Sequence, residues 1–155
     1  MASTQIVSCC SDGALLLWDI TSKDGLPLLR YMGHDRSEIA ACMWNTVHKC
    51  FFITASWDKT CAIWDVTRET AVHHLTGHTE AVFAVMGHPS DGTLYLSGSS
   101  DASVKVWDSR SASAVVSAHG HTTDVLSVEW NKYNPAIFLS GSADSTVAIW
   151  VHIFD

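Results

Sequence analysis

Residues 97–108 have the sequence SGSSDASVKVWD, and the fold follows from this stretch. It begins with a hydroxyl residue, has an aspartate four residues later, and ends on a Trp-Asp pair. The same offsets occur at three other places, so an internal repeat builds the chain. The tryptophans lie 46, 43 and 43 residues apart. The repeated positions are Ser8, Thr54, Ser97 and Ser140 (hydroxyl), Asp12, Asp58, Asp101 and Asp144 (aspartate), and Trp18, Trp64, Trp107 and Trp150 (tryptophan).

A Gly-His pair precedes the last three of these stretches, at Gly33-His34, Gly77-His78 and Gly120-His121. The third pair has a competitor, because His119 lies two residues before His121. His121 is 23 residues from Asp144, which is also the separation of His78 and Asp101. We therefore assign His121 to the repeat.

Each repeat predicts short β-strands and little helix. The apolar runs are four to six residues long, rich in β-branched and aromatic residues, and bounded by turn residues, and none keeps a 3.6-residue period. The expected strands are 39–44, 51–55, 60–64 and 72–75 in one repeat, 82–86, 94–98, 103–107 and 114–118 in the next, and 125–130, 137–141 and 146–150 in the last. A strand is also expected at residues 5–9.

Four strands per repeat, a period of about 43 residues and the paired Gly-His and Trp-Asp signals resemble the WD-repeat family of β-propellers. The resemblance implies an all-β fold: one partial WD40 propeller over residues 1–155, with about three and a half four-stranded blades. The repeats are approximately 1–32 (incomplete), 33–76, 77–119 and 120–155 (incomplete). Propellers of this family usually close with about seven blades. We therefore expect an open arc.

Composition excludes several classes of function. Nine Lys and Arg against 16 Asp and Glu give a net charge of −7, which disfavours nonspecific nucleic-acid binding. No apolar run is long enough to span a membrane, and residues 1–12 do not resemble a signal peptide. The five cysteines show no zinc-type spacing, so we expect reduced thiols, no metal, no cofactor and a cytoplasmic protein.

Ser, His and Asp together invite a hydrolase interpretation, but here the set occurs three times, whereas an active site is normally single. In the WD-repeat family, matching positions form structural hydrogen-bond tetrads, in which the indole, hydroxyl, imidazole and carboxylate are linked in a chain. The resemblance implies that the chain is not an enzyme and that its tetrads are His34/Thr54/Asp58/Trp64, His78/Ser97/Asp101/Trp107 and His121/Ser140/Asp144/Trp150.

Family propellers commonly bind peptides on the face where the short turns gather. The contact positions are the residue before each turn aspartate and the residues that flank the apolar anchor of each first strand. From these positions we expect a peptide-binding site of Glu38, Trp57, Phe83, Asp124 and Leu126. The two acids would form one patch for an arginine, and the apolar residues would receive leucines. Alternatively, Glu38 and Asp124 are only solvated turn acids.

A narrower resemblance lies in residues 55–60 (ASWDKT) and 128–134 (VEWNKYN), which are similar to stretches of receptors for the type 2 peroxisomal targeting signal. Residues 117–119 (SAH) resemble that family's Pro-Ala-His, although the added Gly120-His121 departs from it. The resemblance implies a cytoplasmic import receptor that cycles to the peroxisome or glycosome. Its cargo would carry an N-terminal amphipathic helix with Arg-Leu and His-Leu pairs, and its other partners would be a co-receptor and docking proteins. The alternative is a general WD-repeat scaffold or adaptor.

Overall fold

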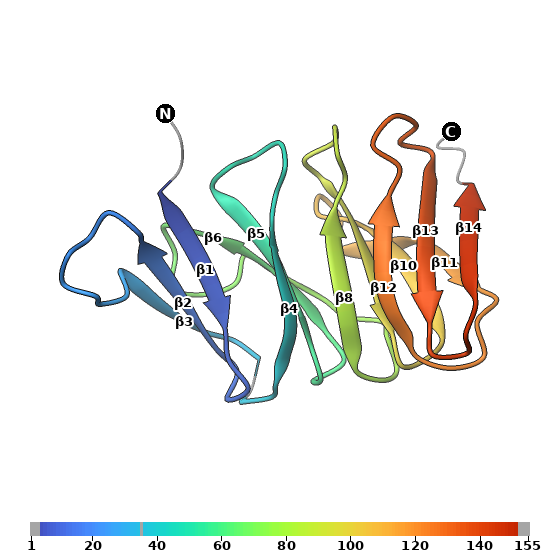
Figure 1. The fold of residues 1–155 in the computed structure, drawn as a ribbon, viewed down its shortest axis with the longest axis horizontal. Helices are drawn as coiled ribbons and strands as arrows, with labels where there is room; N and C mark the ends of the chain where they lie inside the picture. The colour runs from blue at the N-terminus through green and yellow to red at the C-terminus, as the bar shows by residue number, and fades with distance from the viewer. Residues whose placement is uncertain (1–3, 35, 152–155) are drawn as a thin grey trace.

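The computed structural model describes residues 4–34 and 36–151, and every regular element within these ranges is a β-strand. The all-β prediction is therefore confirmed. The strands form four antiparallel sheets, which we call blades 1 to 4 in chain order, and they stand side by side in a curved row (Figure 1). Within each blade, strands adjacent in sequence are adjacent in the sheet.

The two middle blades have four described strands each, and the outer two have three. Blade 1 contains β1 (Gln5–Cys9), β2 (Ala14–Asp19) and β3 (Leu29–Met32). Blade 2 contains β4 (Ile39–Trp44), β5 (Phe51–Ser56), β6 (Cys61–Asp65) and β7 (His73–Leu75). Blade 3 contains β8 (Val82–Gly87), β9 (Leu94–Ser99), β10 (Ser103–Asp108) and β11 (Ser113–His119). Blade 4 contains β12 (Val125–Trp130), β13 (Ile137–Ser142) and β14 (Val147–Val151).

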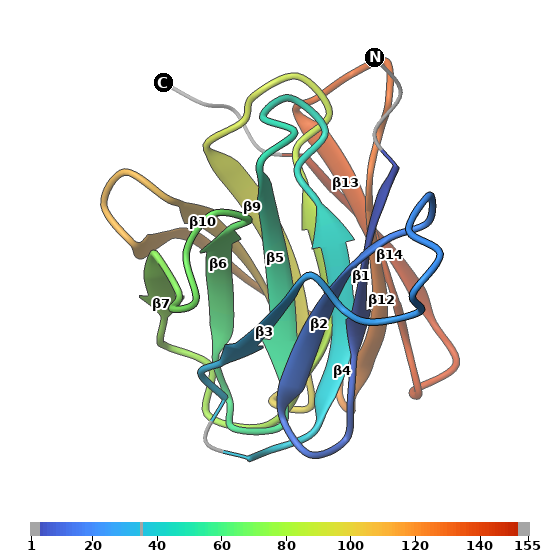
Figure 2. The ribbon, with the colours of Figure 1, turned by 90° about the vertical axis from the view of Figure 1, so that its left-hand side faces the viewer.

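The first strands of blades 2, 3 and 4 lie next to one another along the row, with β8 between β4 and β12 (Figure 1). In the end-on view, blade 1 comes forward, and the strands of blade 2 fan out behind it from β4 to β7 (Figure 2). The hairpin turns that contain the repeated aspartates all lie at one end of the blades, at the bottom of Figure 1. We call this end the turn face.

The hydrophobic core lies between the blades. At the junction of blades 1 and 2, Leu15 and Tyr31 pack with Phe52 and Trp64, and all four side chains are fully buried. Matching clusters fill the next two junctions. Blades 2 and 3 have a neighbouring blade on each face, so their middle strands β5, β6, β9 and β10 are buried along most of their length.

The last strand shows what this packing contributes. Val104 and Val106 of β10 are 1% and 0% exposed because blade 4 covers them. The corresponding residues of β14, Val147 and Ile149, are 71% and 72% exposed. Burial of these positions therefore depends on a neighbouring blade, and no described segment covers this side of blade 4.

Candidate functional site

The turn aspartates fix the local backbone in all four blades. In blade 3, Asp101 Oδ1 accepts hydrogen bonds from the Ser103 amide at 3.0 Å and from its hydroxyl at 2.6 Å. The equivalent amide bonds to Asp12, Asp58 and Asp144 measure 2.9–3.1 Å. The residue after each aspartate has a positive φ, between 62° and 80°. A short side chain that bonds the backbone two residues on is suited to such a turn.

A chain of hydrogen bonds runs from Trp64 to Asp58 through blade 2. Trp64 Nε1 donates to Thr54 Oγ1 at 2.9 Å, and that oxygen lies 2.6 Å from His34 Nε2. His34 Nδ1 lies 2.8 Å from Asp58 Oδ2. Because a carboxylate only accepts, Nδ1 carries the proton, and in the neutral ring the Thr54 hydroxyl donates to Nε2. The bonds link the residues that the sequence offsets group together.

Blades 3 and 4 repeat this chain. Trp107 and Trp150 each donate to a serine hydroxyl at 2.8 Å, which is that of Ser97 in blade 3 and that of Ser140 in blade 4. His78 and His121 each lie 2.8 Å from the same hydroxyl through Nε2. Their Nδ1 atoms lie 2.9 Å from Asp101 and 3.1 Å from Asp144, respectively. His121, and not His119, occupies the repeated position.

Blade 1 has a shorter version. Trp18 Nε1 donates to Ser8 Oγ at 2.9 Å, but the described residues place no histidine between Ser8 and Asp12. Asp12 instead accepts a long 3.5 Å bond from Arg30, and both of these side chains are largely exposed. Such an exposed pair contributes little to stability.

Burial and hydrogen bonding set the protonation states of these chains. Burial alone would raise the pKa of Asp101, but hydrogen bonds from Ser103, Thr79 and His78 outweigh it and hold the pKa well below the ordinary 3.8. Burial lowers the pKa of His78, and its bond to Asp101 offsets this only in part. Ser97 is fully buried between these partners, so the arrangement satisfies polar groups inside a blade. It does not present a nucleophile to a substrate.

The glycine of each Gly-His pair has a steric role. A Cβ at Gly33 would lie 2.6 Å from the Trp64 ring, and one at Gly120 would lie 3.0 Å from the Trp150 ring. Both contacts are closer than ordinary van der Waals distance. The pair therefore combines a residue that lets the indole approach the backbone with the histidine that continues its hydrogen-bond chain.

A second repeated contact builds the turn face. In blades 2 to 4, the amide of the residue before the turn aspartate donates to the carbonyl that precedes the first strand of the same blade: Trp57 to Glu38 at 2.9 Å, Ser100 to Ala81 at 2.8 Å and Ala143 to Asp124 at 2.9 Å. Serine hydroxyls of Ser56, Ser99 and Ser142 donate to the same three carbonyls. Each turn is thereby held against the start of its blade's first strand.

Each first strand begins with a β-bulge. The pairing register shifts between Ile39 and Ala41, between Val82 and Ala84, and between Val125 and Ser127. The extra residues are Ala40, Phe83 and Leu126, which belong to the sequence-derived contact positions. A bulge re-aims a side chain at a strand end. Leu126 is 53% exposed, while Phe83 is half-buried.

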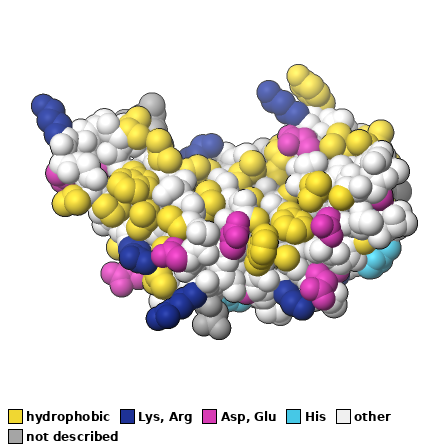
Figure 3. Space-filling model, turned by 60° about the horizontal axis from the view of Figure 1, so that its bottom comes forward, with side chains coloured by type: hydrophobic (Ala, Val, Ile, Leu, Met, Phe, Trp, Pro, Cys, Tyr) yellow, Lys and Arg dark blue, Asp and Glu magenta, His cyan; other side chains and the backbone are white. Residues whose placement is uncertain are grey.

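An aromatic pair bridges blades 2 and 3 on this face. Trp57 is 51% exposed and meets Phe83 edge-to-face, with ring centroids 6.3 Å apart. A 3.3 Å ion pair between Lys59 and Glu80 also joins these blades. Seen from the turn face, apolar side chains extend across the row, and acidic side chains lie among them (Figure 3).

The structure does not bring Glu38 and Asp124 together as one acidic patch. Glu38 precedes β4 and Asp124 precedes β12, so blade 3 stands between them (Figure 1). Glu38 is exposed, whereas Asp124 is half-buried and accepts a 2.6 Å hydrogen bond from the Ser100 hydroxyl. The 43-residue spacing of residues 38, 81 and 124 already places the two acids in non-adjacent repeats, with alanine at the matching position of the repeat between them.

The sequence analysis missed a third repeat of contacts, at the opposite end of the blades. Asn45 Oδ1 accepts two loop amides, while its Nδ2 donates to Gly92 O of blade 3 at 2.8 Å. His88 Nδ1 likewise accepts two loop amides, and its Nε2 lies 3.3 Å from Pro135 O of blade 4. Asn131 accepts the amides of its own loop. The sequence signal for these contacts was the 43-residue spacing of residues 45, 88 and 131.

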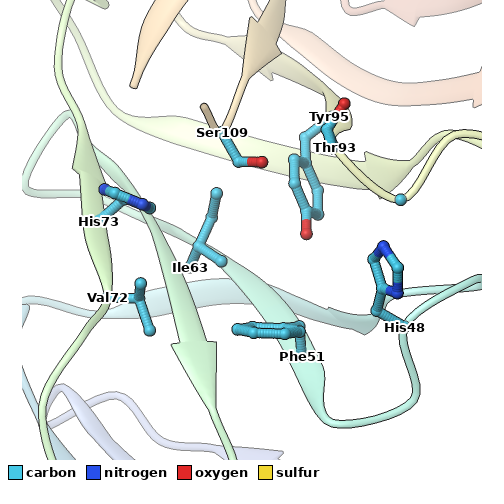
Figure 4. Close-up of a pocket in the computed structure, with 9 residues that line it drawn as sticks. His48, Phe51, Ile63, Val72, His73, Thr93, Tyr95 and Ser109 are labelled. Carbon is cyan, nitrogen blue, oxygen red and sulfur yellow. The ribbon is translucent and has the colours of Figure 1, made fainter. Parts of the chain in front are cut away.

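A small cavity of about 170 Å³ lies near this opposite end, between blades 2 and 3. Phe51, Ile63 and Val72 line one side, Tyr95 faces them, and His48 and His73 stand at its margins (Figure 4). The Tyr95 hydroxyl already accepts a 2.6 Å bond from Asn45. The walls are mostly carbon, so the cavity offers little to a polar ligand.

Over the described residues, no group of three or more potential ligands could hold a metal ion. The same part of the chain contains no helix of the length and apolarity needed to cross a membrane.

Comparison with known proteins gives two results. A family model described as "WD domain, G-beta repeat" matches residues 25–65, 69–108 and 113–151. The peroxisomal targeting signal 2 receptor of Saccharomyces cerevisiae is 35% identical over 72 residues, which are 46% of this chain and 19% of that protein. The receptor of the same name from Schizosaccharomyces pombe is 33% identical over 91 residues, which are 58% of this chain and 29% of that protein.

A relative with a different name matches to a similar extent. The ribosome biogenesis protein WDR12 homolog of Caenorhabditis briggsae is 28% identical over 82 residues, 52% of this chain and 18% of that protein. The chain thus spans less than a third of the length of each of these relatives.

Proposed function

Because this chain belongs to the WD40 repeat family, we propose that it is a non-catalytic, peptide-binding part of a propeller and that its turn face receives the targeting signal of a cargo protein. The tetrads are the scaffold of this face. The binding site comprises Glu38, Trp57, Phe83, Asp124 and Leu126.

The exposed Trp57 carries the proposal. Trp57 lies in a hairpin turn with half of its side chain facing solvent, and its backbone is held by the hydrogen bond to Glu38 O. Phe83 supports one edge of the indole. Rigid, exposed aromatic side chains with apolar neighbours are typical anchors of protein interfaces.

The charges favour a basic peptide. Glu38 is exposed beside Trp57, and Lys59, one of the cations near it, is paired with Glu80. The net charge of −7 acts in the same direction at longer range. Because blade 3 separates the acids, Glu38 would hold the arginine of the ligand. Asp124, already bonded to Ser100, would have a smaller part.

The names of several relatives suggest the ligand class. Proteins from two yeasts are peroxisomal targeting signal 2 receptors, and the chain's similarity to them motivates a cargo with the type 2 signal. On this proposal the protein moves between cytoplasm and peroxisome (or glycosome) with a co-receptor and docking proteins. The ribosome biogenesis relative supports the second candidate, a scaffold that assembles a complex without reading this signal.

The test is a fluorescence-polarisation titration of the full-length protein with a labelled type 2 signal peptide and with its Arg-to-Ala version. Trp57→Ala should weaken binding about 30-fold, as expected for loss of an interface anchor worth about 2 kcal/mol. Glu38→Gln should weaken it about tenfold and should reduce its salt dependence. Asp124→Asn should have a smaller effect.

Two matched controls lie at the other end of the blades: Tyr133→Ala, an aromatic residue 91% exposed, and Glu69→Gln, an exposed acid. Both should bind as the wild type does. Equal binding of the signal peptide and its Arg-to-Ala version would favour the scaffold. If Trp57→Ala and Glu38→Gln both bind with unchanged affinity, the binding site does not lie on this face.

A further inference from the structure

Two cysteine thiols meet where blade 1 packs against blade 2. Cys9 is the last residue of β1, and Cys42 lies in the middle of β4, 33 residues further along the chain. The Cys42 thiol donates to the Val7 carbonyl with a sulfur–oxygen distance of 3.7 Å. The Cys9 thiol is a neighbour of the Cys42 thiol and contributes to raising its pKa. The contact therefore joins two different sheets.

The positions of the two cysteines on regular strands fix this arrangement. Val7 and Cys9 are two residues apart on β1, so their side chains lie on the same face of the strand. Both pack against the buried cluster between the two blades. The Ile39 amide, at the start of β4, donates to the Cys10 carbonyl just after β1 at 3.4 Å, which ties the two strand ends together.

We propose that Cys9 and Cys42 are a modification site, at which a peroxide converts the two thiols into a reversible disulfide that cross-links blades 1 and 2. This proposal is independent of the peptide-binding function. It needs no metal and no residue of the turn face.

The chemistry balances with hydrogen peroxide as the oxidant. The Cys9 sulfur, as thiolate, attacks one peroxide oxygen and becomes a sulfenic acid, and the other oxygen leaves as water after taking up a proton. The Cys42 sulfur then attacks the Cys9 sulfur, the S–O bond breaks, and the Cys42 proton leaves with that oxygen as a second water. Two thiols and one peroxide thus give one disulfide and two waters, and a dithiol reverses the oxidation.

The surroundings assign the order of these steps. Burial, together with the neighbouring Cys9, raises the pKa of the Cys42 thiol to about 12. Cys42 is therefore almost entirely protonated near neutral pH and is a poor first nucleophile. Cys9 reacts with the peroxide, and Cys42 reacts second because its thiol lies against β1, two residues from Cys9 along the strand.

The other cysteines provide internal controls. Cys10 follows Cys9 directly but has no described contact with Cys42, Cys50 is exposed in the loop after β4, and Cys61 is fully buried in blade 2. A disulfide that forms because Cys9 and Cys42 are neighbours should not include any of these three cysteines. Oxidation by exposure alone would select Cys50.

The experiment treats the full-length protein with hydrogen peroxide, blocks the remaining thiols and digests with trypsin without reduction. Cleavage after Lys23, Arg36 and Lys49 separates a peptide with Cys9 and Cys10 (residues 1–23) from one with Cys42 (residues 37–49). The expected product is these two peptides joined, with the mass of two hydrogens missing. Dithiothreitol should release both.

Cys9→Ser and Cys42→Ser should each abolish the joined product, whereas Cys10→Ser and Cys50→Ser should leave its yield unchanged. Wild-type protein should also melt at a higher temperature after oxidation, because the cross-link restricts the unfolded chain, and Cys9→Ser should not. A joined product that persists in Cys9→Ser, or oxidation that reaches Cys50 while residues 1–23 and 37–49 remain separate, would overturn the proposal.

Discussion

Thr54→Val tests the hydrogen-bond chain at its central link. The substitution keeps the branched shape of the side chain and removes only the hydroxyl, which accepts from Trp64 Nε1 and bonds His34 Nε2. Trp64, His34 and Thr54 are all 0% exposed, so water cannot replace the lost partner. Each buried polar group left unpaired costs about 1–3 kcal/mol.

Two groups lose one shared partner, so we expect a loss of about 2–4 kcal/mol in the free energy of unfolding. For a chain of this size each kcal/mol lowers the melting temperature by about 2–4 °C, which gives a decrease of about 5–15 °C. Urea unfolding followed by circular dichroism measures the free energy, and a thermal scan measures the shift.

Thr54→Ser is the matched variant, since blades 3 and 4 already have serine there, at Ser97 and Ser140. It keeps the hydroxyl and loses one methyl group, at a cost of about 1 kcal/mol. Thr122→Val changes an exposed threonine and should stay within about 0.5 kcal/mol of the wild type. The reasoning is refuted if Thr54→Val is as stable as the wild type, or if Thr54→Ser is the less stable of the two Thr54 variants.

Three further predictions concern other repeated features. Gly33→Ala should lower the free energy of unfolding in urea by about 1–3 kcal/mol, because its Cβ would collide with the Trp64 ring. Gly87→Ala is the comparison, because a Cβ there would make only ordinary van der Waals contacts, the nearest at 3.8 Å. His88→Ala should lower the free energy of unfolding by about 1–3 kcal/mol in the same assay. His88→Asn should lower it clearly less, because asparagine at positions 45 and 131 accepts the equivalent loop amides. Equal losses of free energy in the two variants would contradict this. Asp101→Asn should flatten the acid limb of a stability–pH profile. The folded-state pKa of Asp101 is depressed, so its contribution is complete above the ordinary 3.8 and is lost as the pH falls below it; an unchanged slope would contradict this.

The repeat made the fold predictable from sequence. Each blade keeps the same offsets between Trp, Asp and hydroxyl residues, and strands expected from short apolar runs lie within one or two residues of the observed ones. The differences are at strand ends: β6 begins at Cys61 and not at Thr60, for example.

The face was only partly predictable. Spacing placed Trp57, Phe83 and Leu126 at one end of the blades, but the contact between Trp57 and Phe83 depends on how blade 3 packs beside blade 2. The bulges that expose residues 83 and 126 leave no distinct sequence signal, because they arise from the pairing register of two strands.

By itself, then, the sequence determined which residues form each blade, because turns, strands and tetrads are built from contacts within one repeat and repeat with it. Only the tertiary structure decided what happens between repeats. It joined Asn45 and His88 to the following blades and set the Cys42 thiol against β1. These contacts depend on the spacing and angle of neighbouring sheets, which packing of the shared apolar core sets and which no offset along the chain encodes.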